Sequence, residues 1–222
     1  MQNGTVNERY IYVMLSQTPT GFGKTIRKVM GYTYNHTSIA FDKELVQLYS
    51  FGRKVHKVPV VAGLVREYPE RFSLNVTSDV PVRIYRIPVT QEQYDIGLSR
   101  IQEILDDEDE YLYNLYSVLL YPVFRGFSTF KAYHCTEFVA HLLQRMKVEL
   151  HEDKPACGIT PEGMKVLLQD YEICYEGNLL EYVSDLSEHR PVYFRSPNMK
   201  DGIATVYTLG RLVCRTGSGK KL

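Results

Sequence analysis

The chain has 222 residues, 44% of them hydrophobic and 12% aromatic, which is enough to bury the core of one large domain. Its 26 basic residues balance 26 acidic residues, so it lacks the basic excess of proteins that bind nucleic acid or anionic membranes. No apolar run approaches the roughly 20 residues of a membrane-crossing helix, no secretory leader is visible, and the four cysteines are dispersed. We therefore expect a cytoplasmic protein with reduced thiols, no transmembrane segment and no nucleic-acid partner.

The first half of the chain predicts strands and a hairpin. Runs rich in β-branched and aromatic residues predict strands over 9–17, 36–41, 45–52 and 82–89. The polar turn 42–44 joins the second and third runs into a β-hairpin. A short helix is expected over 24–30. Pro59, Pro69 and Pro81 interrupt the stretch 53–82, which is expected to be irregular.

The second half predicts helices and then short strands. Thr90 and Gln93 form a capping box at the start of a helix that ends in an acidic, solvated turn at 106–110. The apolar stretch 111–124 fits either a helix or a strand. Thr160, followed by Pro161, begins another helix. Beyond Tyr171 we expect strands over 192–195 and 203–215 and a disordered tail over 216–222. These elements predict one α+β domain over 1–187, with a C-terminal extension, 188–222, packed on it.

The stretch "KAYHCTEFVAHLLQRM" contains the most informative cysteine. The helical apolar pattern begins at Phe138, so Cys135 lies at or near the first turn of a helix. A helix N-terminus and a nearby imidazole populate the thiolate form of a cysteine, and the same backbone N–H groups can bind an oxyanion. The alternative is that Cys135 is a small buried core residue.

One of the six histidines is placed to be its partner. His134 is adjacent to Cys135, and its side chain should point away at a helix start. His36 opens a predicted strand and shares a face with Ser38 and Ala40, whose small side chains leave room for a neighbour. A helix packed over that face could bring Cys135 to His36. A histidine that merely caps a loop is the alternative.

These two segments, "NHTSIAFD" with "LVQLYSFGRK" and, later, "YHCTEFVAHLL", resemble the circularly permuted papain-like enzymes of the YiiX-like branch of the NlpC superfamily. The resemblance covers roughly residues 9–182. It implies an α+β, permuted papain-like fold with an antiparallel sheet packed against helices. It also implies that Cys135 is the nucleophile and His36 its general base and acid.

The third, orienting residue departs from the family's pattern. The resemblance places it in the window 48–51, where a two-residue turn would set Phe51 opposite His36. Ser50 is the preferred candidate, Tyr49 the alternative, and Gln47 lies just outside the window. Glu67 is a distant alternative that could fold back. Tyr133 and His134, beside the nucleophile, are the candidate substrate-binding residues, although core packing is the simpler explanation for Tyr133.

The reaction that the resemblance implies is hydrolysis of an amide, peptide or acyl substrate through a thioester, with no metal and no organic cofactor. Three alternatives stay open. The chain could be a lapsed enzyme that keeps the fold as a binding module, which the missing carboxylate favours. It could act on lipid acyl groups as a hydrolase or acyltransferase. It could also be a plain interaction domain in which Cys135 belongs to the core. The sequence does not indicate the oligomeric state.

Overall fold

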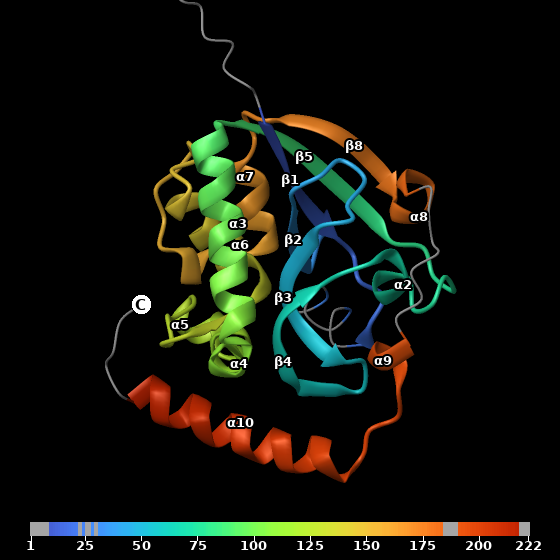
Figure 1. Cartoon of the computed structure of the whole chain (residues 1–222), viewed down its shortest axis with the longest axis vertical. Coiled ribbons are helices and arrows are strands. Elements are labelled where there is room, and N and C mark those ends of the chain that lie inside the picture. The colour runs from blue at the N-terminus through green and yellow to red at the C-terminus, as the bar shows by residue number, and fades with distance from the viewer. Residues whose placement is uncertain (1–8, 22–23, 25–27, 29–30, 184–190, 218–222) are drawn as a thin grey trace, which may run out of the picture.

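A computed structural model describes residues 9–21, 24, 28, 31–183 and 191–217. Its centre is a six-stranded sheet with the order β4-β3-β2-β1-β5-β8, in which every neighbouring pair is antiparallel (Figure 1). The strands are β1 (Arg9–Ser16), β2 (His36–Ala40), β3 (Leu48–Val55), β4 (Val58–Arg66), β5 (Pro81–Val89) and β8 (Glu172–Asn178). Helices pack against this sheet, which confirms the α+β prediction.

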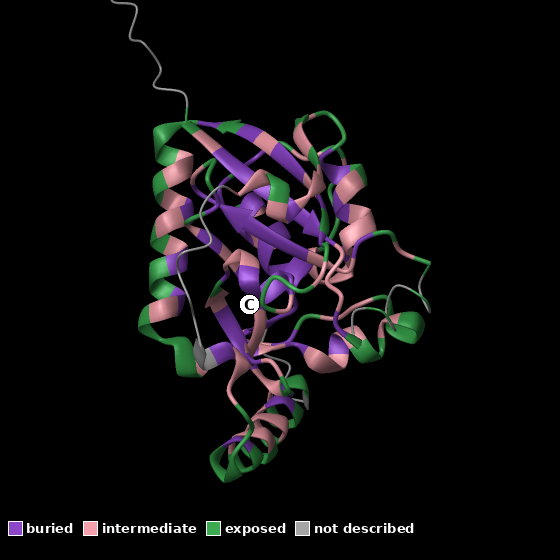
Figure 2. Ribbon diagram, turned by 90° about the vertical axis from the view of Figure 1, so that its right-hand side faces the viewer, coloured by how far each residue is buried: buried purple, intermediate pink, exposed green. Residues whose placement is uncertain are grey.

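Helices cover both faces of the sheet. On one face lie α3 (Gln91–Asp106), α6 (Cys135–Arg145) and α7 (Pro161–Leu167), and their apolar side chains form the larger core cluster with strands β1, β2, β3 and β5. On the other face, α2 (Pro69–Phe72) and α8 (Leu179–Tyr182) cover a smaller cluster. The central strands are consequently buried along most of their length (Figure 2). β1 accordingly reads as a continuous apolar run and not as an alternating one.

The ambiguous stretch after α3 forms several short elements. It contains the 3₁₀ turn η1 (Glu108–Glu110), β6 (Leu112–Tyr113), α4 (Leu115–Leu119), α5 (Tyr121–Phe124) and β7 (Ala132–Tyr133). β6 and β7 pair in parallel, and β7 leads directly into α6. A second 3₁₀ turn, η2 (Ala156–Gly158), connects α6 to α7.

The predicted hairpin forms, but its register differs by one residue. β2 pairs with β3 so that Ile39 faces Tyr49 and Ala40 faces Leu48. The predicted two-residue turn sets Phe51 opposite His36, which corresponds to Tyr49 opposite Ser38. The turn is longer than two residues because the Asp42 carboxylate accepts the backbone N–H groups of Val46 and Gln47, at 2.7 and 2.6 Å. A one-residue slip exchanges the faces of every side chain on a strand.

The prediction of an irregular stretch over 53–82 is wrong. β3 continues to Val55, β4 follows after a tight turn, and α2 comes next. The prolines are compatible with these elements because of where they fall. Pro59 lies on β4, the edge strand, where a missing N–H is tolerated. Pro69 takes the first turn of α2, and Pro81 is the first residue of β5.

The helix starts agree with the capping signals in the sequence. At α3, Thr90 accepts the Gln93 N–H while the Gln93 side chain accepts the Thr90 N–H. At α7, Thr160 accepts the Gly163 N–H, and Pro161 occupies the first turn. The short helix expected over 24–30 falls mostly outside the described residues.

The strands predicted for the C-terminal extension are wrong, because the described part of this extension is helical. α9 (Pro191–Phe194) contacts β3, and α10 (Met199–Gly217) lies along β4 at the base of the molecule (Figure 1). Asn198 and Asp201 each accept the backbone N–H of the other, which caps α10. Residues 218–222 of the expected tail lie outside the described part.

The acidic turn anchors α10 instead of being only solvated. Glu110 pairs with Arg211 and Arg215, each at 2.8 Å. Among the described residues, no helix is both long and apolar enough to cross a membrane.

Candidate active site

Cys135 is the first residue of α6, and a network of backbone contacts fixes it there. His134 is the N-cap: its ring accepts the Glu137 N–H at 3.2 Å, and the Glu137 carboxylate accepts the His134 N–H at 3.1 Å. Thr136 bonds to Thr37 of β2 at 3.0 Å and so ties the helix start to the sheet. Cys135 is 6% exposed and lines a cavity. The N-terminal position predicted for it is therefore observed.

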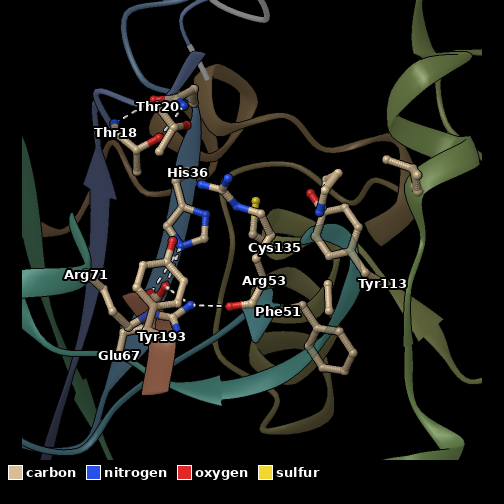
Figure 3. Close-up of a pocket in the computed structure, with 15 residues that line it drawn as sticks. Thr18, Thr20, His36, Phe51, Arg53, Glu67, Arg71, Tyr113, Cys135 and Tyr193 are labelled. Atoms are coloured by element: carbon tan, nitrogen blue, oxygen red, sulfur yellow. Dashed lines mark hydrogen bonds and ion pairs between the residues drawn. The ribbon is translucent and has the colours of Figure 1, made fainter. Parts of the chain in front are cut away.

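His36 is the first residue of β2. α6 packs on the face of β2 that carries Ile39, and not on the face of Ser38 and Ala40 as expected. Because His36 is at the strand end, its ring still lines the same cavity as Cys135 (Figure 3). The structure thus brings together two residues that are 99 positions apart in the sequence, as are Thr37 and Thr136, which are bonded beside them.

The residue that orients His36 is Glu67, which follows β4. Its two carboxylate oxygens both lie 3.1 Å from His36 Nε2, so this nitrogen carries a proton and donates it. Ser38 donates to the same carboxylate at 2.5 Å, and Arg71 lies 3.9 Å away. Glu67 is 5% exposed. This contact fixes the tautomer of His36 and leaves Nδ1 for the side of the ring that faces Cys135 (Figure 3).

Cys135, His36 and Glu67 shift one another's pKa values toward the charged forms. Burial disfavours a thiolate, but the His36 imidazolium lowers the pKa of Cys135 well below its usual value. Burial also opposes a charge on His36, yet Glu67 and Cys135 raise its pKa to about 10. For Glu67, burial is again outweighed, and His36 lowers its pKa. These directions favour a thiolate–imidazolium pair beside a carboxylate, which is the charge state that a cysteine nucleophile needs.

A cavity of about 90 Å³ opens between Cys135 and His36. Its wall combines a polar side, an aromatic side and two arginines (Figure 3). The lining residues besides Cys135, His36 and Glu67 are Thr18, Thr20, Asn35, Phe51, Gly52, Arg53, Pro59, Ala62, Arg71, Tyr113, Leu115 and Tyr193. Tyr193 comes from α9, so the C-terminal extension supplies part of the wall.

Hydrogen-bond donors gather beside the sulfur. In α6, the amides of Glu137 and Phe138 donate to His134, whereas those of Cys135 and Thr136 have no acceptor within the helix. The Tyr113 phenol interacts with Cys135, and burial followed by the Cys135 charge raises the pKa of Tyr113 well above its usual value. The phenol is therefore protonated and can donate. Together these groups could stabilise an oxyanion formed at Cys135.

Ser50 and Tyr49 do not contact His36. Ser50 is fully buried, and its hydroxyl makes no hydrogen bond. Tyr49 packs against the larger core cluster. The position next to the imidazole is filled by Glu67, which the sequence offered only as a distant alternative. The expectation that the orienting residue lies within 48–51 depended on the hairpin register, and the observed register differs by one residue.

The two candidate substrate-binding residues lie outside the cavity wall. Tyr133 is 1% exposed and packs against Phe51 and Phe138, with its hydroxyl 3.3 Å from Arg100. His134 is occupied by the cap of α6. Core packing, the alternative given for Tyr133, is what the structure shows.

Sequence reasoning missed Arg53 and Tyr193 as lining residues and ranked Glu67 too low. A signal for Glu67 was present, because it is a carboxylate between the apolar run of β4 and a proline-started turn. Placing it requires knowing that β4 pairs with β3, and its N–H donates to the Leu48 carbonyl at 2.7 Å. Short-range patterns do not contain that information.

Within the described part of the chain, no group of three or more His, Cys, Asp or Glu side chains is arranged to hold a metal ion. Comparison with protein-family models, curated proteins and solved structures gives no match to this chain. The geometry of the site therefore carries the functional conclusion.

Proposed function

We propose that the protein is a cysteine-dependent acyl hydrolase that acts on an amide, peptide or related acyl substrate. The observation that carries this proposal is the line Cys135–His36–Glu67, in which a buried carboxylate orients an imidazole that faces a thiol at a helix N-terminus. The order of histidine before cysteine supports the permuted papain-like fold and family that the sequence resembles. The unpaired, dispersed cysteines support a cytoplasmic location.

The reaction would run in two halves. The Cys135 thiolate attacks the carbonyl carbon, and the negative charge moves to the carbonyl oxygen near the Cys135 and Thr136 amides and the Tyr113 hydroxyl. His36 gives its Nδ1 proton to the leaving group, the carbon–leaving group bond breaks, and a thioester remains. Water then attacks the thioester, His36 accepts its proton, and the acid product leaves with the thiolate regenerated. Glu67 keeps the ring oriented throughout.

A lapsed enzyme was the strongest alternative because no carboxylate stood near His36 in the sequence. Glu67 takes that position, so the reason for this alternative is gone. The cavity of about 90 Å³ has room for only several water molecules. This volume favours a small group at Cys135 over a long lipid acyl chain.

The proposal is tested with p-nitrophenyl acetate, an activated ester that reports on the first half of the reaction. We expect a burst of nitrophenolate with one acetyl group located on Cys135 by peptide mass spectrometry. Cys135→Ala should show neither, whereas Cys157→Ala, a matched loss of another unpaired thiol, should behave as the wild type. A burst that persists in Cys135→Ala would overturn the proposal.

A further inference from the structure

Arg53 differs from every other charged residue of the cavity because its charge is not compensated. Its guanidinium donates to the His56 carbonyl at 2.7 Å, and no carboxylate among the described residues pairs with it. Its side chain extends from β3 into the cavity that Cys135 and His36 line (Figure 3). An arginine charge in a cavity with no partner calls for an anion from outside, because a guanidinium is always protonated.

The charge of the second arginine of the cavity is compensated by a carboxylate of the protein. Arg71 is 8% exposed, stacks over the Tyr193 ring at 4.0 Å and lies 3.9 Å from Glu67. It also donates to the Arg53 carbonyl at 2.7 Å, and so holds the strand that carries Arg53. Since Cys135 balances His36 and Arg71 balances Glu67, the cavity carries a net positive charge that comes from Arg53.

The strand itself places Arg53 in the cavity. The pairing of β3 with β4 is regular up to Arg53, which faces Ala62, and shifts between Arg53 and Val55. A bulge of this kind bends a strand and changes the direction of its side chains, and such bulges are frequent beside active sites. The next residue, Lys54, points elsewhere and pairs with Glu108 at 2.9 Å.

We infer that Arg53 binds a carboxylate of the substrate, close to the bond that is cleaved. This inference rests on the proposed acyl-hydrolase function and names its substrate class, which is an acylated amino acid or the C-terminal end of a peptide. The small cavity limits the separation, because Arg53 and Cys135 line the same space of about 90 Å³. A bidentate interaction between the Arg53 guanidinium and the substrate carboxylate would also fix the orientation of the scissile bond.

Two alkylating reagents that differ only in charge test this inference directly. Iodoacetate carries a carboxylate, and iodoacetamide of nearly the same size does not. In both cases the Cys135 thiolate attacks the methylene carbon, a sulfur–carbon bond forms and iodide leaves. We expect the ratio of the iodoacetate rate to the iodoacetamide rate at Cys135 to exceed that of a small free thiol by about tenfold.

Arg53→Gln should lower that ratio by about tenfold, and Arg53→Lys should keep part of the preference. Lys54→Gln removes a neighbouring positive charge outside the cavity and should leave the ratio unchanged. Because the ratio compares two reagents at the same thiol, a general change in the reactivity of Cys135 cancels from it.

Each outcome is informative. If Cys135 reacts rapidly with iodoacetamide but shows no preference for iodoacetate, the role of Arg53 is disproved and the proposed hydrolase stands. If Cys135 reacts with neither reagent near pH 6, the proposed function itself fails. Alkylation forms no oxyanion, so an arginine that served only to stabilise an oxyanion would leave the ratio unchanged, which also contradicts the inference.

Discussion

Two histidines flank Cys135, and the structure gives them different surroundings. His36 is the first residue of β2 and has a buried carboxylate on Nε2, at 3.1 Å. His134 is the neighbour in sequence, and both of its nitrogens contact backbone groups: Nδ1 accepts the Glu137 N–H, and Nε2 lies 3.3 Å from the Cys157 carbonyl. One ring is free to exchange a proton with the cavity, and the other is part of a helix cap.

This difference in hydrogen bonding indicates the protonation state of His134. Burial opposes a charge on His134, although the nearby Cys135 and Glu137 raise its pKa. A proton on Nδ1 would face the Glu137 N–H and break the cap, so we assign His134 as neutral. Closeness in sequence to a nucleophile is thus a poor guide to a general base. The hydrogen bonds that a ring already makes are a better one.

The largest effect should come from replacing His36, whereas replacing His134 should have little effect on the rate. We expect His36→Ala to lower the rate of acyl transfer to p-nitrophenyl acetate by about 10²- to 10⁴-fold, because the general base is lost. His134→Asn keeps a good capping residue and should lower the rate by less than about threefold. Equal losses in both variants would contradict the contrast.

The next effect concerns the residue that orients His36. Glu67→Gln should lower the same rate by at least about tenfold, because the imidazolium loses its charged partner. Glu70→Gln alters a second buried carboxyl, which lies three positions on, and should leave the rate nearly unchanged. Ser50→Ala should also be neutral, since the Ser50 hydroxyl contacts no polar partner. A tenfold loss in Ser50→Ala with none in Glu67→Gln would reverse the assignment.

The pair should also be visible in the free energy of unfolding. His36 has its pKa raised from 6.5 to about 10, so the stability from its charge is full below pH 6.5 and is lost as the pH rises through about 10. Glu67 has its pKa lowered from 4.5, so its contribution is present above pH 4.5 and is lost on acidification. The difference between wild type and Glu67→Gln should therefore be largest between pH 4.5 and 6.5.

Urea denaturation at several pH values measures this difference. A difference that grows steadily toward pH 10 would contradict the ion pair, because His36 loses its charge there.

The smallest effect should come from Tyr133, the residue before the cap. Tyr133→Phe removes a hydroxyl that lies 3.3 Å from Arg100 and keeps the ring in the core. We expect a loss of about 1 kcal/mol in the free energy of unfolding and unchanged acyl transfer. A rate reduced tenfold at unchanged stability would return Tyr133 to the cavity wall as a substrate-binding residue.

Local signals in the sequence predicted the parts of the fold that depend on local contacts. The caps at Thr90 and Thr160 and the start of α6 at Cys135 follow from a few neighbouring residues. The pairing of His36 with Cys135 was suggested first by the position of His36 at a strand start beside small side chains, and then by the family resemblance. It depends on the packing of α6 against β2.

The parts that were missed depend on long-range packing. β4 contains a proline and was predicted to be irregular, yet as an edge strand it tolerates that residue. Glu67 could not be ranked first without this strand. α10 is rich in β-branched residues, and its N-terminal cap, formed by Asn198 and Asp201, was the overlooked signal for a helix.

The measurement that tests the central claim most directly is the rate of iodoacetamide labelling of Cys135 as a function of pH, in wild type, His36→Ala and His134→Asn. Our account predicts rapid labelling near pH 6 in wild type and in His134→Asn. In His36→Ala it predicts a profile shifted to the ordinary thiol range, with a midpoint at or above about pH 8.5. Slow labelling of wild type near pH 6, or a profile that His36→Ala leaves unchanged, would contradict the thiolate–imidazolium pair.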